Sequence, residues 1–153
     1  MKLYISPSSC SLSPHIALRE AGLDFELIRV DLKTHTLVSD GSDFTLINPK
    51  GYVPVLELDD GSRLTEGTAI VQYIADLNPA AGLAPQAGTL ERYRLQEWLG
   101  FINSEIHKGF GPLFKPNTPE AYKTIARQNL TQRLAYVAEQ LAARDYLMGA
   151  QFT

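Results

Sequence analysis

The sequence has 153 residues, 44% of them hydrophobic and 20% charged, with a formal net charge of −3. These values are typical of a globular chain with one ordinary domain or two small ones, and the charge gives no signal for a nucleic-acid or anionic-membrane partner. No apolar run approaches the roughly 20 residues that span a bilayer, and the N-terminus lacks the long apolar segment of a secretory signal.

The chain has a single cysteine, Cys10, so it cannot form an intrachain disulfide. A chain without disulfides suits a reducing compartment, and we expect a cytoplasmic location. The three histidines have no close ligand spacing, and one cysteine cannot build a zinc site, so we expect no metal. No glycine loop of the phosphate-binding kind is present either.

The first half of the chain alternates between strand and helix patterns. Residues 3–5 and 25–30 are rich in β-formers and predict strands. Between them, residues 11–21 predict a helix that Gly22 ends. The polar residues 34–42 predict a loop.

A hairpin and a second helix follow. Residues 55–58 and 63–65 predict strands joined by the Asp-Asp-Gly turn at 59–61. Residues 68–77 predict a helix, which Asn-Pro at 78–79 ends. The order β-α-β, loop, β-β-α indicates an α/β domain with a four-stranded mixed sheet.

The second half of the chain predicts helices only. The composition changes at the Ala- and Gly-rich residues 80–88, which are the best linker candidate. Residues 89–108 predict one long helix that the glycines and proline at 109–112 break. Thr118-Pro119-Glu120 predicts the start of another helix with Thr118 as its N-cap.

Four motifs in a fixed order carry a family resemblance. They are Ser-Cys-Ser-Leu-Ser-Pro-His at 9–15, Asn-Pro-Lys-Gly-Tyr-Val-Pro at 48–54, Leu-Thr-Glu-Gly at 64–67 and Glu-Ile-His-Lys-Gly at 105–109. Each is weak alone, but together they resemble the bacterial beta-class glutathione S-transferases over the whole chain. The resemblance implies a thioredoxin-like domain at 1–78, a linker at 79–88 and the start of an all-helical domain at 89–153.

The resemblance also implies a detoxifying homodimer that takes glutathione as cosubstrate and a small hydrophobic electrophile, with no permanently bound cofactor. It implies Cys10 and His107 as catalytic residues. The implied glutathione contacts are Cys10, His35, Val53, Glu66, Gly67, Ser104, Glu105, Ile106, His107 and Lys108. The family continues for several more helices, so we expect the sequence to be truncated within its helical domain.

The chemistry of Cys10 follows from its place between a strand and a helix. A thiol at a helix N-terminus faces free N–H groups and a positive dipole end, which favour the thiolate. Ser13 stands where redox proteins of the thioredoxin type have a second cysteine, so an external thiol would have to resolve a disulfide. The alternative is a buried structural cysteine.

Two further segments could hold the peptide. In the family the Val53-Pro54 bond is cis, which would turn the Val53 backbone toward an extended peptide; the alternative is an ordinary trans turn. Glu66-Gly67 opens a helix whose N-terminus could bind the γ-glutamyl carboxylate, while the Glu66 carboxylate receives the ammonium. The alternative is a plain acidic first turn.

The histidines also allow two interpretations. His107 could move a proton near the thiol, or it could, with Lys108, compensate the dipole at the end of its helix. His35 stands where the family has a lysine for the glycine carboxylate, and it could serve either protonated or as a neutral donor.

Three functions remain open from the sequence. The leading one is conjugation of glutathione to electrophiles. The second is a glutathione-dependent thiol–disulfide oxidoreductase that forms a mixed disulfide at Cys10. The third is a non-catalytic ligand-binding protein.

Overall fold

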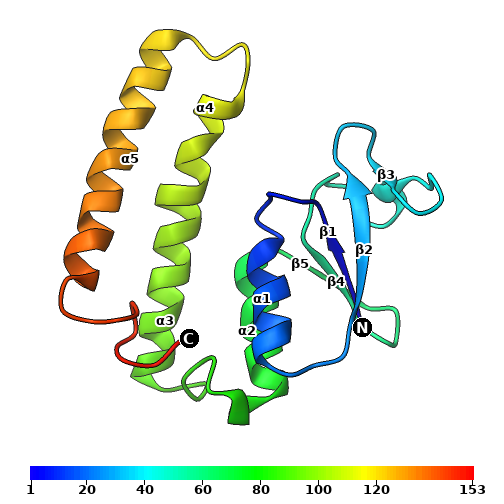
Figure 1. Cartoon of the computed structure of the whole chain (residues 1–153), viewed down its shortest axis with the longest axis horizontal. Coiled ribbons are helices and arrows are strands. Elements are labelled where there is room, and N and C mark those ends of the chain that lie inside the picture. The colour runs from blue at the N-terminus through cyan, green and yellow to red at the C-terminus, as the bar shows by residue number, and fades with distance from the viewer. The chain divides into compact units, whose positions relative to one another are not determined.

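The computed structural model describes all of residues 1–153. The chain divides into two compact units, Met1–Ala84 and Pro85–Thr153 (Figure 1). The division falls inside the segment 79–88. The first part of that segment packs with the first unit, because Leu83 is buried in its core after the short 3₁₀-helix η2 (Pro79–Ala81).

The first unit is built on one mixed sheet. Its strands are β1 (Lys2–Ile5), β2 (Glu26–Asp31), β3 (Thr36–Leu37), β4 (Val55–Glu57) and β5 (Arg63–Thr65), in the order β3-β2-β1-β4-β5. Only β1 and β2 run parallel, and the other neighbours are antiparallel. A short parallel pair between hairpins is the arrangement that the β-α-β, β-β-α order predicts.

The prediction of four strands is wrong by one. The polar stretch 34–42, predicted as a loop, contributes the edge strand β3, where Leu37 pairs with Val30. The chain reverses just before it at His35, which has a φ of 55°. Two residues are too few to show an alternating pattern, so the sequence carries no signal for this strand.

Two helices cover one face of the sheet (Figure 1). They are α1 (Leu12–Glu20) and α2 (Gly67–Leu77), each within one residue of its predicted start. The core between them and the sheet is formed by Leu3, Leu18, Leu56, Ile70 and Ile74, all fully buried. A second cluster forms around Phe44, in the short 3₁₀-helix η1 (Phe44–Leu46), with Tyr4, Val30, Val53 and Val55.

The second unit is a helical hairpin (Figure 1). Its segments are α3 (Leu90–Phe101), the π-helix η3 (Ile102–His107), the 3₁₀-helix η4 (Lys108–Phe110), α4 (Gly111–Phe114) and α5 (Glu120–Leu141). Thr89 caps α3 by accepting a hydrogen bond from the Arg92 N–H at 3.3 Å. None of the helices is long and apolar enough to cross a membrane.

Two details of the predicted helices are wrong. The helix predicted for 89–108 changes its hydrogen-bond pattern at Ile102 and stays helical to Phe114. Pro112 does not break it, since it lies in the first turn of α4, where its missing N–H is not needed. Thr118 does not cap α5: the cap residue is Pro119, and no side chain caps this end.

The helical hairpin packs through aromatic rings and through two buried aliphatic side chains of α5. The Tyr136 ring of α5 lies 5.8 Å from the Trp98 ring and 5.4 Å from the Phe101 ring of α3. Ala126 and Leu130 of α5 are buried on the same helix. These contacts fix α5 against the segment that carries residues 102–110.

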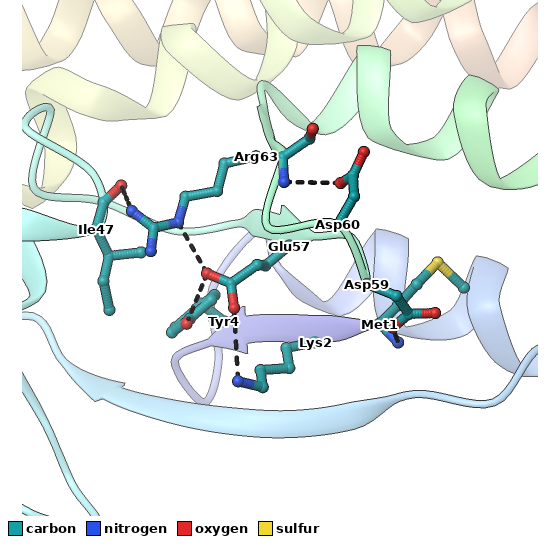
Figure 2. A network of polar contacts seen from close by, with 9 residues as sticks. Met1, Lys2, Tyr4, Ile47, Glu57, Asp59, Asp60 and Arg63 are labelled. Carbon is teal, nitrogen blue, oxygen red and sulfur yellow. Dashed lines mark hydrogen bonds and ion pairs between the residues drawn. The ribbon is translucent and has the colours of Figure 1, made fainter.

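A polar network ties the strands of the first unit together (Figure 2). Glu57 of β4 accepts a hydrogen bond from Arg63 Nε at 2.8 Å and one from the Tyr4 hydroxyl at 3.3 Å. Its other oxygen lies 3.5 Å from Lys2 Nζ. The hydrogen bond from Arg63 lowers the pKa of the Glu57 carboxyl, although burial opposes this.

This network predicts an acid-sensitive contribution to stability. A depressed folded-state pKa stabilises the fold above the unfolded value of about 4.3, and this contribution is lost as pH falls through the folded-state pKa. Glu57→Gln should therefore cost about 1 kcal/mol at neutral pH, the order for a partly exposed ion pair.

The difference in urea unfolding free energy between the two proteins should shrink below about pH 4. The matched control is Asp24→Asn, which changes an exposed carboxyl that makes no ion pair. A Glu57→Gln deficit that is the same at acid and neutral pH would contradict the assignment.

Candidate functional site

The sheet register brings two of the sequence motifs together. The antiparallel pairing sets Tyr4 of β1 beside Val55 of β4, so the C-terminal end of β1 lies next to the start of β4. Cys10 follows β1 and Val53 precedes β4. Their contact is direct: the Cys10 Sγ lies 3.4 Å from the Val53 carbonyl oxygen.

Cys10 lies in the turn between β1 and α1 and its side chain is exposed. The alternative of a buried structural cysteine therefore does not hold. Ser11 is the N-cap residue of α1, but its side chain does not cap the helix. It is buried, and its hydroxyl bonds with the Ser6 backbone and the Ser9 hydroxyl, which fixes the turn beneath the thiol.

Two influences on the thiol oppose each other. A sulfur that hydrogen-bonds to a carbonyl oxygen must carry its proton, so the Val53 contact favours the thiol. The adjacent start of α1 presents a positive dipole end, which favours the thiolate. A ligand that donates its own hydrogen bond to the Val53 carbonyl would displace the Cys10 thiol from it. The contact that favours the protonated form of Cys10 would then be lost.

The segment before β4 has the backbone form that the resemblance implies. The Val53-Pro54 peptide bond is cis. Asn48, which is buried, supports this segment: its side-chain amide donates to the Tyr52 carbonyl at 2.7 Å, and its oxygen accepts from the Lys50 N–H at 3.2 Å. From the sequence, Asn48 was predicted only to lie in a turn, and its support of this segment was not predicted.

Glu66 lies at the start of α2 in a left-handed conformation, with a φ of 70°. Its carboxylate accepts a hydrogen bond from Lys50 Nζ at 2.7 Å, and the same ammonium lies 3.0 Å from the Thr65 hydroxyl. This contact with Glu66 raises the pKa of Lys50. A cation thus already occupies one side of the Glu66 carboxylate, and this role of Lys50 was not predicted from the sequence. Gly67 follows, and a Cβ added there would lie 4.0 Å from the Pro54 ring.

His35 is held against the loop before Val53. Its Nδ1 lies 2.9 Å from the Gly51 carbonyl oxygen. Gly51 has a φ of 74°, and a Cβ there would come within 3.1 Å of the ring, so the contact requires glycine. Because a carbonyl only accepts, Nδ1 carries a proton, and Nε2 of the neutral ring is an acceptor. Nε2 can therefore donate to a carboxylate only in the imidazolium.

Asp43 is the acidic neighbour of His35. Hydrogen bonds from the Thr45 side chain and backbone lower the pKa of the Asp43 carboxyl, and the charge of His35 adds to this effect. Asp43 is exposed and uses Oδ1 to cap η1. A carboxylate thus already lies near the ring that the resemblance assigns to carboxylate binding.

The second unit gathers the remaining predicted residues in one segment. Ser104, Glu105, Ile106 and His107 lie in the π-helix η3, and Lys108 begins η4. A π-helix is rare and is frequently found at functional sites. His107 and Lys108 are exposed, and Ile106 is half-buried.

A cavity of about 580 Å³ lies between this segment and α5. Its lining includes Ser104, Glu105, Lys108, Tyr122 and Arg133. Arg133 Nε donates to Glu105 Oε2 at 2.8 Å across the cavity wall. Cys10 and His107 belong to different units, so their approach to one another stays a prediction.

Comparison with known proteins places the chain in a family. A family model described as glutathione S-transferase, N-terminal domain, matches residues 7–77. The chain is 49% identical over 153 residues to glutathione S-transferase GstA of Escherichia coli O157:H7. The match covers 100% of this chain and 76% of that relative.

Solved structures of bacterial glutathione S-transferases are also similar to this chain. The ternary complex of BphK, a bacterial GST, has a TM-score of 0.97 at 57% identity, over 100% of this chain and 76% of that one. The beta-class glutathione S-transferase of Sphingomonas chungbukensis has a TM-score of 0.94 at 48% identity, over 100% and 76%. A sphingomonad glutathione S-transferase complexed with glutathione has a TM-score of 0.95 at 52% identity, with the same coverage.

The thioredoxin-like sheet followed by a helical unit is thus a fold that this chain shares with bacterial glutathione S-transferases over 76% of the length of the solved chains. The chain belongs to the glutathione S-transferase family.

Proposed function

We propose that this protein conjugates the glutathione thiol to small hydrophobic electrophiles in the cytoplasm, as a detoxifying enzyme. The observation that carries the proposal is the exposed Cys10 sulfur, 3.4 Å from the Val53 carbonyl at the edge of the sheet. Glutathione is the cosubstrate, and no permanent cofactor takes part.

The first unit offers a place for each end of the tripeptide. An extended peptide can pair with the Val53 backbone as an added strand. The N-terminus of α2 at Gly67 suits the γ-glutamyl carboxylate, because helix N-termini bind anions. The Glu66 carboxylate suits the ammonium, and His35 suits the glycine carboxylate at the other end.

Conjugation needs the sulfur of glutathione as a thiolate next to the electrophile. Cys10 stands at the thiol end of the proposed groove, and His107 is a residue type that exchanges a proton near neutral pH. Holding the two reactants together converts a bimolecular encounter into a step within one complex, which lowers the barrier.

A second function is supported by the exposure of Cys10 and by Ser13 at the position of a resolving cysteine. In this reaction the Cys10 thiolate attacks a sulfur of a glutathione-containing disulfide and expels the other thiolate. A glutathione thiolate then attacks the Cys10 mixed disulfide, so that glutathione disulfide leaves and the Cys10 thiolate is restored.

We also propose that the protein is a homodimer. Two large apolar side chains near the Asn48 turn lie open to solvent: Leu46 is 80% exposed and Tyr52 is 52% exposed. We take these two side chains, one on each side of the Asn48 turn, as part of an apolar patch that a second copy covers.

Light scattering should give the mass of two chains for the wild type and of one for Leu46→Glu. Val38→Glu, at a site that is 57% exposed, should leave the dimer intact. A wild-type monomer would contradict the proposal.

Cys10→Ser separates the two reactions. We expect the variant to lose all glutathione–disulfide exchange, because no other sulfhydryl is present. It should keep part of the conjugation of glutathione to a chloro-nitrobenzene, since there the nucleophile is the glutathione sulfur. The measurements are the two turnover rates and the intact mass after treatment with glutathione disulfide.

Two outcomes contradict these functions. Disulfide exchange at the wild-type rate in Cys10→Ser removes the second one. A wild type that binds glutathione but turns over neither substrate removes both and leaves the non-catalytic ligand-binding protein.

The place of His35 against the Gly51 loop predicts that the charge at position 35 sets the affinity for the tripeptide. His35→Lys, which presents a fixed positive charge to the glycine carboxylate, should lower the Kd, and His35→Gln, which presents no charge, should raise it. The expected change is about fivefold, corresponding to the ~1 kcal/mol of an exposed charge pair. Calorimetry with S-methylglutathione avoids interference from the cosubstrate thiol.

The matched control is His15→Gln. His15 lies on α1 and its ring packs against Phe25, and this variant should keep the wild-type Kd. An unchanged Kd in both His35→Lys and His35→Gln would contradict the proposed contact.

A further inference from the structure

The π-helix η3 is the common support of four of the residues proposed to meet glutathione. Ser104, Glu105, Ile106 and His107 all lie in its six residues. A π-turn directs side chains differently from an α-turn, so the directions of these groups depend on the segment keeping this form. Within the segment, the Ser104 hydroxyl bonds back to the Gly100 carbonyl at 3.0 Å.

Helix α5 packs against the chain next to η3. A Cβ added at Gly109, just after η3, would lie 2.9 Å from Leu130 Cδ2. Leu130 is buried, and its side chain packs against the η4 backbone at this point only because residue 109 is a glycine. The position of α5 therefore bears directly on η4, which follows η3 without a break.

Arg133 lies three residues after Leu130 on α5, and thus on the same face of that helix. Its Nε donates to Glu105 Oε2 at 2.8 Å, a link between positions 28 apart in the sequence. Both side chains are 43% exposed. A pair this exposed contributes little to overall stability, so its main effect is on the direction of the Glu105 side chain and the turn that carries it.

We infer that Arg133 is a positioning residue for the proposed reaction: acting through Glu105, it fixes the turn of η3 that presents Ser104 and His107 to glutathione. The inference rests on the proposed function. The guanidinium suits this task, because its rigid fork holds a carboxylate in a defined direction, whereas a lysine ammonium is a flexible point charge.

Arg133→Gln tests the inference. We expect the KM for glutathione to rise about fivefold and kcat to fall, with the melting temperature little changed. Arg133→Lys should recover part of the KM effect, since it restores the charge without the fork. In a Glu105→Gln background, Arg133→Gln should add nothing further, because the group through which it acts is gone.

The matched control is Arg127→Gln. Arg127 also lies on α5 and also makes an exposed ion pair at 2.9 Å, but its partner Glu120 belongs to α5 itself and not to η3. It should keep wild-type kinetics.

Three results would overturn the inference. They are unchanged kinetics in Arg133→Gln, an effect that adds fully to that of Glu105→Gln, or an equal loss in Arg127→Gln. An inactive wild type would instead contradict the proposed function, and calorimetric binding of S-methylglutathione would still compare the variants.

Discussion

The antiparallel pairing of β1 with β4 is the constraint on which the site depends. It sets Lys2 opposite Glu57 and Tyr4 opposite Val55, so the turn after β1 and the loop before β4 meet at one edge of the sheet. The pairing is held from both sides: fully buried Leu3 and Leu56 pack beneath the helices, and Glu57 bridges β1 and β5 on the other face. A slip of one residue would turn Leu3 and Leu56 toward solvent and carry the thiol away from Val53.

Much of the fold could be predicted because long elements carry periodic signals. The patterns at 11–21 and 68–77 give α1 and α2 nearly to the residue. The two-residue strand β3 could not be predicted, since its pairing depends on the left-handed backbone at His35. The change from α- to π-helix at Ile102 also has no sequence signal, because both forms place apolar residues at similar spacing.

The candidate site residues also differ in how far the sequence predicts them. Cys10, Glu66 and Gly67 could be named as candidates because each lies in a motif next to a helix start, where the chemistry follows from local position. Lys50 and Arg133 were missed because each acts on a carboxylate far along the chain, at Glu66 and Glu105. Such roles depend on tertiary contacts, which spacing along one sequence does not reveal.

The ion pair between Lys50 and Glu66 has a consequence for selectivity. Because Lys50 already pairs with the Glu66 carboxylate, this end of the proposed groove exerts little long-range attraction on the amino group of an arriving ligand. A peptide that offers only a positively charged terminus gains no binding free energy from Glu66 over its interaction with water. Discrimination must then come from close-range fit, in which a ligand competes with the lysine by offering donors at the correct angle and distance.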